Sequence, residues 1–257
     1  MFVPLYDVNP TRTVPFVNYL LLGTNVVAWG LELLLMGAWG PAVVTAGYGL
    51  VPLRLLGDPG GELFTVLTSM FMHGSWAHIG GNLLFLYIFG DNVEEALGHG
   101  RYGLFYLLCG AAAAAAQVVV DPSSHVPMVG ASGAIAGVLG AYLVLHPRAP
   151  IVMLNTILPL WFILGITVVF PAWLAIGMWF LLNIFGGLSA LGMGFGEGVA
   201  YFAHIGGFAS GLLLVRPWML GRHKPQATAW AGWRLPQRPT DSRPRSEGAH
   251  RDPWYPF

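Results

Sequence analysis

The chain has 257 residues, of which 55% are hydrophobic and only 9% are charged, and its formal net charge is zero. A water-soluble domain of this length cannot hide so much apolar surface, because its exterior must be largely polar. The composition therefore excludes an ordinary soluble domain, and the lack of a charge excess argues against a nucleic-acid partner. The main solvent of the chain is expected to be the lipid bilayer.

Apolar stretches that can cross the hydrocarbon layer, each of about 20 residues, recur along the chain. The candidate spans are residues 14–37, 63–90, 101–120, 132–146, 171–188 and 199–216. Residues 38–62, between the first two spans, are rich in glycine and proline and are expected to form an interfacial loop. The predicted fold class is an all-α polytopic membrane protein, a bundle of six transmembrane helices.

Residues 150–170 are also apolar enough to span, but three prolines punctuate this stretch. With six spans, the loops on the side of the N-terminus hold the basic residues Arg12, Arg101, Arg148, Arg216, Arg222 and Lys224. The opposite loops hold only Arg54 as a basic residue, and this bias places both termini in the cytoplasm. A seventh span would reverse the last helix, so residues 150–170 are interpreted as interfacial or re-entrant. The expected location is a plasma membrane or bacterial-type inner membrane.

The composition changes sharply after residue 220. Residues 221–257 hold seven of the twelve basic residues together with many prolines, which predicts a disordered cytoplasmic tail. The expected organisation is a cytoplasmic N-terminal segment at residues 1–13, a membrane domain at 14–220 and this tail.

Three groups of polar residues stand inside the spans, where polar side chains are costly. The run Gly130-Ala131-Ser132-Gly133 opens the fourth span, and Ala203-His204-Ile205-Gly206-Gly207 lies near the start of the sixth. The second span holds His73, His78 and Asn82. Taken alone, a G-x-S-G run is usually helix packing, and a lone histidine can be a satisfied structural group. Taken together, the three groups are far more specific than any one of them alone.

Ser132 and His204 are expected to lie at a similar depth. The fourth and sixth helices both begin at the outer side, and each residue lies within about two turns of its helix start. Small residues mark one face of each helix, which lets two backbones approach closely; these residues are Gly133, Gly137, Gly140, Gly207 and Gly211. If these faces meet, the imidazole can accept the serine hydroxyl proton and activate the serine as a nucleophile.

The second span offers hydrogen-bond donors for the same site. His78 and Asn82 are four residues apart on one helical face, and both side chains can donate, as can the backbone N–H of Ser132. Converging donors are what a developing oxyanion requires. His73 is open between lining a water-accessible cavity and bracing the outer loop. No cofactor is expected, and no metal, because His73 and His78 would point about 140° apart on a helix and no H-E-x-x-H motif exists.

The run from His73 to Asn82, the Gly130–Gly133 motif and the run from Ala203 to Gly207 resemble the rhomboid family of intramembrane serine proteases. The resemblance covers residues 1–216. It implies a six-helix rhomboid-like bundle with a Ser132–His204 dyad and no catalytic aspartate. It also implies an oxyanion hole formed with His78 and Asn82, and a structural glutamate at Glu94.

The expected activity is cleavage of transmembrane segments near the outer face, through an acyl-enzyme, in single-span or multi-span membrane-protein substrates. The resemblance further suggests substrate access past the fifth span, beneath a loop at residues 189–198. Glycines there suit a mobile cap; they are Gly186, Gly187, Gly192, Gly194, Gly196 and Gly198.

Two positions depart from the family pattern. Some rhomboids carry a Trp-Arg pair in the first outer loop, where this chain has Phe64-Thr65. Some have a tyrosine four residues after the nucleophile that stacks on the histidine, where this chain has Ala136. What anchors the outer loop and what holds the His204 ring are therefore open.

Two rival functions belong to other classes. A proteolytically silent rhomboid-like binding protein would typically lack the serine or the histidine, and this chain keeps both. A transporter or channel would continue its polar path through the inner half of the helices, but the fourth and sixth spans turn apolar there. Gln117 and Asn183 are expected to be interhelical hydrogen-bonding groups rather than reactants.

Overall fold

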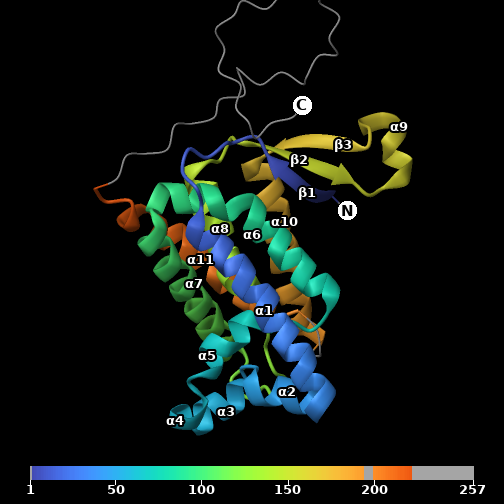
Figure 1. The fold of residues 1–257 in the computed structure, drawn as a ribbon. Helices are drawn as coiled ribbons and strands as arrows, with labels where there is room; N and C mark the ends of the chain where they lie inside the picture. Colours follow the sequence, from blue (N-terminus) through green and yellow to red (C-terminus); the bar gives the residue numbers. More distant parts are fainter. Residues whose placement is uncertain (1, 194–198, 222–257) are drawn as a thin grey trace, which may run out of the picture.

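The computed structural model describes residues 2–193 and 199–221 (Figure 1). Within these residues the bundle consists of six long helices. They are α1 (Phe16–Trp39), α6 (Trp76–Leu97), α7 (His99–Val120), α8 (Ser132–Leu145), α10 (Ala172–Met193) and α11 (Tyr201–Trp218). Each corresponds to one candidate span. The predicted start of the second span was wrong, because α6 begins at Trp76 rather than near residue 63.

Three helices of the described residues, α1, α7 and α10, are long and apolar enough to cross a membrane by length and composition. The helix α8 is apolar but only 14 residues long. The helices α6 and α11 carry polar residues, among them Asn82 and His204, that lower their hydropathy. These two helices therefore give a weaker span signal than α1, α7 and α10.

The centre of the bundle is α8, and its residues from Gly133 to Tyr142 are all buried. It packs most closely against α11 and α7. A helix of this length is about 21 Å long, which is shorter than the hydrocarbon core of about 30 Å. Such a helix suits a position enclosed by longer neighbours rather than one that faces lipid.

The glycine faces of α8 and α11 meet. A Cβ atom on Gly207 would clash with the carbonyl oxygen of Gly133, and one on Gly211 would clash with that of Gly137. Only glycine permits this backbone contact, in which small residues replace bulky side chains between two helices. The contact holds the N-terminal ends of α8 and α11, with Ser132 and His204, side by side.

The segment before α6 is largely helical, so the loop predicted at residues 38–62 was wrong. It contains the short helices α2 (Pro41–Tyr48), α3 (Pro52–Gly57), α4 (Pro59–Glu62) and α5 (Thr65–Thr68), followed by the 3-10 turn η1 (Ser69–Phe71). They lie at the lower end of the molecule in Figure 1. Three of them begin with proline, whose fixed backbone angle suits the first helical position and whose missing N–H is not needed there.

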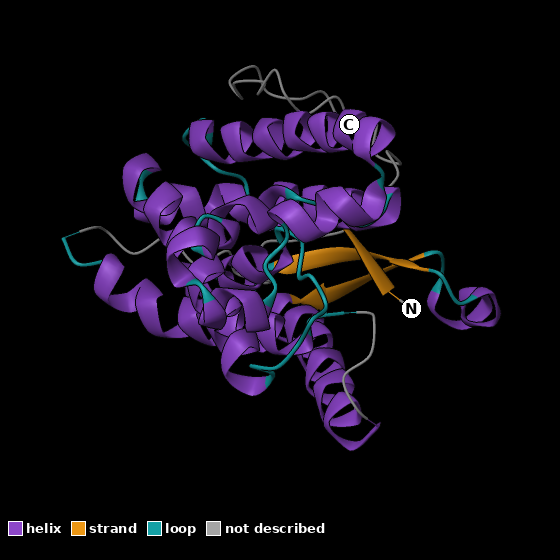
Figure 2. Ribbon diagram, turned by 90° about the horizontal axis from the view of Figure 1, so that it is seen from below, coloured by secondary structure: helices purple, strands orange, loops and turns teal. Residues whose placement is uncertain are grey.

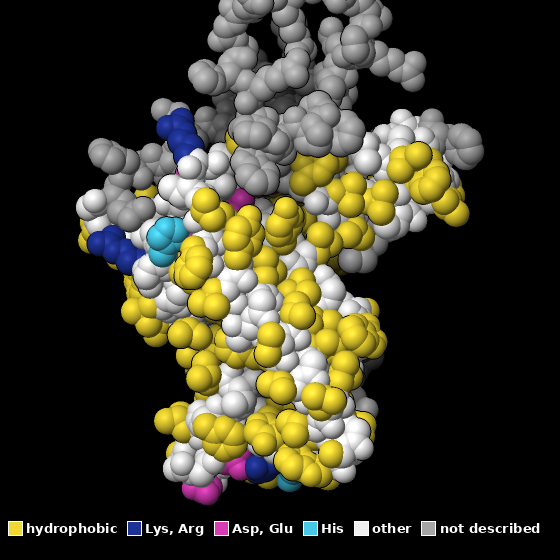
Figure 3. Space-filling model, in the orientation of Figure 1, with side chains coloured by type: hydrophobic (Ala, Val, Ile, Leu, Met, Phe, Trp, Pro, Cys, Tyr) yellow, Lys and Arg dark blue, Asp and Glu magenta, His cyan; other side chains and the backbone are white. Residues whose placement is uncertain are grey.

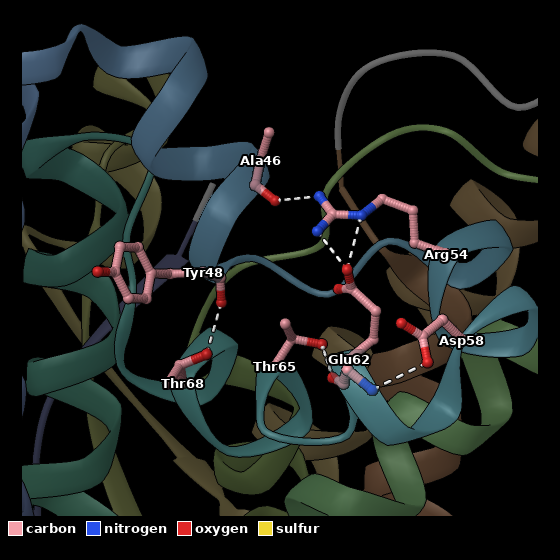
Figure 4. Close-up of polar contacts among 8 residues, drawn as sticks. Ala46, Tyr48, Arg54, Asp58, Glu62, Thr65 and Thr68 are labelled. Atoms are coloured by element: carbon pink, nitrogen blue, oxygen red, sulfur yellow. Dashed lines mark hydrogen bonds and ion pairs between the residues drawn. The ribbon is translucent and has the colours of Figure 1, made fainter.

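Polar contacts hold this segment before α6 together (Figure 4). Arg54 forms an ion pair with Glu62 and donates a hydrogen bond from Nη1 to the carbonyl oxygen of Ala46 at 2.5 Å. Thr68 Oγ1 donates to the carbonyl oxygen of Tyr48 at 2.6 Å. The chain lacks the Trp-Arg pair, and these bonds anchor the segment in its place.

The opposite end of the bundle carries a three-stranded antiparallel sheet in the order β1-β2-β3 (Figure 2). The strands are β1 (Phe2–Asp7), β2 (Pro150–Asn155) and β3 (Thr167–Pro171). The turn η2 (Leu158–Leu160) and the short helix α9 (Trp161–Leu164) connect β2 to β3. The all-α prediction was therefore wrong for this end of the molecule. Residues 150–170 do not form a re-entrant segment, because β2 and β3 pair with each other and β2 also pairs with β1.

Charged residues mark the two ends of the molecule. Hydrophobic side chains cover the flank of the bundle in Figure 3, and charged side chains gather near its ends. Of the described arginines, four lie beside helix ends at the sheet end of the bundle, and only Arg54 lies in the segment before α6 at the other end. The four are Arg12, Arg101, Arg148 and Arg216.

Candidate active site

Ser132 and His204 lie within hydrogen-bonding distance of each other. Ser132 is the first residue of α8, and His204 stands in the first turn of α11. His204 Nε2 lies 2.7 Å from Ser132 Oγ. Both side chains line a cavity of about 800 Å³, which extends to Asp121 and Ser124 in the loop after α7. The geometry allows the imidazole to accept the hydroxyl proton beside a space that can hold an extended peptide.

The turn that presents Ser132 depends on Gly130. This residue has φ of +129°, a conformation that L side chains rarely adopt. A Cβ atom here would lie 2.7 Å from His78 Nε2, so the missing side chain also leaves room for the His78 ring. The backbone N–H of Ser132 is among the first N–H groups of α8, which have no partner inside the helix.

Two further donors face the same cavity from α6. His78 and Asn82 both line it, one turn apart. Asn82 Nδ2 is buried without a hydrogen-bond partner among the described residues. The backbone N–H of Gly74 donates to His78 Nδ1 at 3.4 Å, which leaves the proton of the neutral ring on Nε2, the nitrogen beside Gly130. Donors of this kind can stabilise an oxyanion formed at Ser132.

His73 stands before α6 rather than within it. Its ring is fully buried and packs against the rings of His78 and Trp29, with centroids 5.2 Å and 6.3 Å away. Its backbone N–H donates to Glu32 Oε2 at 2.9 Å. The prediction that His73 and His78 point apart was wrong, because it placed both on one helix. These contacts favour the alternative in which His73 braces the loop, here the one that precedes α6.

The His204 ring is held by two residues of α10. Asn183 Oδ1 lies 2.6 Å from His204 Nδ1. The ring of Trp179, one turn earlier on α10, has its centroid 5.6 Å from that of His204. The sequence interpretation of Asn183 as an interhelical hydrogen-bonding group is confirmed, but its partner was missed, and so was Trp179. The available signal was an aromatic and an amide four residues apart in an otherwise apolar helix.

Gln117 makes the second interhelical bond predicted from sequence. Its Oε1 accepts a hydrogen bond at 3.3 Å from the backbone N–H of Ala203, which lies in the first turn of α11. This N–H has no partner inside its own helix, so Gln117 on α7 serves as a cap for α11. It steadies the residue next to His204.

The glycine-rich cap that the sequence predicted is partly helical in the structure. Gly186 and Gly187 lie inside α10, which continues to Met193, and not in a loop. A Cβ atom on Gly186 would clash with the ring of Tyr201, so this glycine permits close packing of α10 on the start of α11. Three other glycines of the predicted cap lie outside the described residues; they are Gly194, Gly196 and Gly198.

Glu94 lies in the last turn of α6 and is buried. Its carboxylate accepts hydrogen bonds from the backbone N–H groups of Val17 at 2.9 Å and Asn18 at 2.6 Å, in the first turn of α1. His99 Nδ1 lies 2.5 Å from the same side chain. An anionic group at this position satisfies free N–H groups and complements the positive end of the helix. The contacts are those of a structural residue.

Comparison with known proteins places these motifs in a family. A rhomboid domain model matches residues 60–221. RHOMBOID-like protein 4 of Arabidopsis thaliana is 34% identical over 176 residues, which cover 65% of this chain and 39% of that protein. Rhomboid protease GluP of Bacillus subtilis is 42% identical over 83 residues, or 32% of this chain and 16% of that protein.

A yeast relative extends the comparison. Rhomboid protein 1, mitochondrial, of Saccharomyces cerevisiae is 29% identical over 157 residues, which cover 58% of this chain and 40% of that protein. The chain spans about half or less of the length of the curated relatives it matches. The family match extends over more than half of the chain and includes all three polar motifs. The chain is a multi-pass membrane protein that belongs to the rhomboid family.

Proposed function

We propose that this protein is an intramembrane serine endopeptidase, with Ser132 as the nucleophile and His204 as the general base. The observation that carries the proposal is the 2.7 Å contact between His204 Nε2 and Ser132 Oγ beside the cavity. Family membership supports it, because rhomboid proteases act on membrane-protein substrates within the bilayer. No cofactor takes part in this chemistry.

The reaction follows from the positions of these groups. A transmembrane segment of a membrane-protein substrate unwinds near the outer face and extends into the cavity. His204 removes the proton from Ser132, whose oxygen attacks the scissile carbonyl, and the resulting oxyanion accepts hydrogen bonds from Ser132 N–H, His78 and Asn82. His204 then protonates the leaving amine. Water, deprotonated by His204, hydrolyses the acyl-enzyme and restores Ser132.

The proposed topology has six spans formed by α1, α6, α7, α8, α10 and α11. The sheet end, with four of the five described arginines, faces the cytoplasm, and the active site opens toward the outer side. Residues 14–220 then form the membrane domain, and both termini are cytoplasmic in a plasma membrane or bacterial-type inner membrane. The predicted tail at residues 221–257 lies outside the described residues, apart from Gly221.

Cleavage of a single-span substrate in liposomes tests the proposal. The wild-type chain is compared with Ser132→Ala and His204→Ala, and with Ser210→Ala as a matched control. Ser210 lies on α11 and donates to the carbonyl oxygen of Gly207, away from the cavity lining. We expect Ser132→Ala and His204→Ala each to lower the rate by about 10³-fold or more, whereas Ser210→Ala cleaves like wild type. Cleavage by Ser132→Ala at the wild-type rate would refute the proposal.

A further inference from the structure

We propose that Asn183 is a positioning residue for His204: its side-chain amide selects the imidazole tautomer that can remove the Ser132 proton. The inference rests on the proposed function and adds a third member, contributed by α10, to the Ser132–His204 pair. Asn183 is buried, and its side chain spans the interface between α10 and α11.

The orientation of the Asn183 amide follows from its other hydrogen bond. Asn183 Nδ2 donates to the backbone carbonyl oxygen of Trp179, one turn earlier, at 2.8 Å. The amide nitrogen is therefore directed back along α10, and Oδ1 is the atom that faces His204 at 2.6 Å. A flipped amide would place Oδ1 against the carbonyl oxygen of Trp179, which cannot donate a hydrogen bond, so the bond to Trp179 would be lost.

This orientation determines the position of the imidazole proton. An amide oxygen can only accept a hydrogen bond, so His204 Nδ1 must carry the proton that is donated to it. In the neutral ring, Nε2 is then bare and accepts the hydroxyl proton of Ser132 across 2.7 Å. The opposite tautomer would place N–H toward Ser132, and His204 could not act as its base.

The chemistry of asparagine suits this location. A neutral amide orients the ring without burying a permanent charge among apolar helices, where a carboxylate is costly. Trp179 lies against the ring of His204, while Asn183 holds its Nδ1 edge. Two residues one turn apart on α10 thus restrict both the tilt and the rotation of the imidazole. In this chain Trp179 and Asn183 hold the His204 ring, because Ala136 has no aromatic ring that could stack on it.

Kinetics separate positioning from a purely structural role. Asn183→Leu removes the acceptor at similar volume, and Asn183→Asp keeps an acceptor. Leu182→Ala alters a neighbouring side chain of α10 that is 64% exposed and serves as the control. In liposomes we expect Asn183→Leu to lower kcat by about 10²-fold with KM nearly unchanged. Asn183→Asp should recover most of that loss, and Leu182→Ala should match wild type.

Histidine-selective ¹⁵N NMR of the wild-type protein in bilayers tests the tautomer directly, and His204→Gln assigns the signal. The expected spectrum has the proton of His204 on Nδ1, and a spectrum with the proton on Nε2 would overturn the inference even if no folded Asn183 variant could be produced. Wild-type kcat in folded Asn183→Leu would also overturn it. If Ser132→Ala is silent in that same assay, the proposed protease function stands without Asn183. Cleavage by Ser132→Ala would instead defeat the proposed function itself.

Discussion

The polar residues of the site come from four different helices. Ser132 stands on α8, His204 on α11, Asn183 on α10, and Asn82 on α6. Each of these groups would be costly in hydrocarbon, and each is either bonded to another member or faces the cavity. The buried amide of Asn82 faces the cavity, and its Nδ2 has no hydrogen-bond partner among the described residues. An unused donor beside a nucleophile fits a group whose partner forms only during the reaction.

We expect Asn82→Ala to lower kcat by about 10²–10³-fold, because one oxyanion donor is lost. KM should change little, since the bond forms with the oxyanion and not with the ground-state substrate. Steady-state kinetics on a single-span substrate in liposomes check this. A variant that keeps the wild-type kcat would exclude Asn82 from the oxyanion hole.

At the scale of elements, the contact between α8 and α11 sets the geometry of the site. Gly211 packs directly against the carbonyl oxygen of Gly137, and backbone atoms cannot move aside as a flexible side chain can. The two helices must therefore separate if a methyl group is added. Because Ser132 and His204 begin these helices, their 2.7 Å contact depends on the same packing.

We expect Gly211→Ala to destabilise the protein by about 1–3 kcal/mol, the usual effect of overpacking, and to lower cleavage activity. Gly23→Ala on α1 is the matched control, because a Cβ atom there meets nothing within 4 Å in the described part of the chain. Thermal unfolding in detergent and cleavage in liposomes measure the two effects. Equal stability of the two variants would mean that the helices can separate freely.

The sheet is tied to the bundle through a buried carboxyl group. Asp7 Oδ2 accepts hydrogen bonds from the Tyr142 hydroxyl at 2.5 Å and from Asn92 Nδ2 at 3.2 Å. Burial, together with the nearby charge of Asp91, raises the pKa of Asp7 to about 8 despite the hydrogen bond from Tyr142. In the unfolded chain the pKa of an aspartate is about 3.9, so between these two values only the folded state holds the proton.

Stability should therefore fall as pH rises from about 4 to 8, by up to about 1.4 kcal/mol per pH unit. The stabilisation is complete below the unfolded pKa and is lost as pH passes the folded pKa. Asp7→Asn cannot ionise, and we expect it to flatten this slope and to be the more stable form above pH 8. Thermal unfolding at a series of pH values measures the slope. A slope that is unchanged in Asp7→Asn would show that another group causes it.

For the whole molecule, the sequence predicted much of the bundle and of the site. The contact between Ser132 and His204 could be predicted from the sequence, because both residues lie at the start of helices that run in the same direction and carry glycine faces. Asn183 could not be assigned its partner, since an amide in an apolar helix can bond to any neighbouring helix. Local pattern does not specify which neighbour that is.

The sheet escaped prediction for a related reason. Phe2 pairs with Asn155, and neither segment shows the alternation that marks a strand with one exposed face. Residues 150–154 form a continuous apolar run, which fits a span, a buried helix or a buried strand equally well. The strand forms because it pairs with β1, which is far away in the sequence. Such a long-range pairing arises only in the folded chain and cannot be read from the local pattern.

The most direct test of the account is covalent labelling of Ser132 by a fluorophosphonate, which reacts with activated serines. The protein is labelled in liposomes, and peptide mass spectrometry locates the adduct. The account predicts one dominant adduct at Ser132 in the wild-type protein and its loss in His204→Ala, with Ser210 unlabelled. Equal labelling of Ser132 in wild type and His204→Ala would contradict the role of His204. An active protein without any adduct at Ser132 would contradict the central claim.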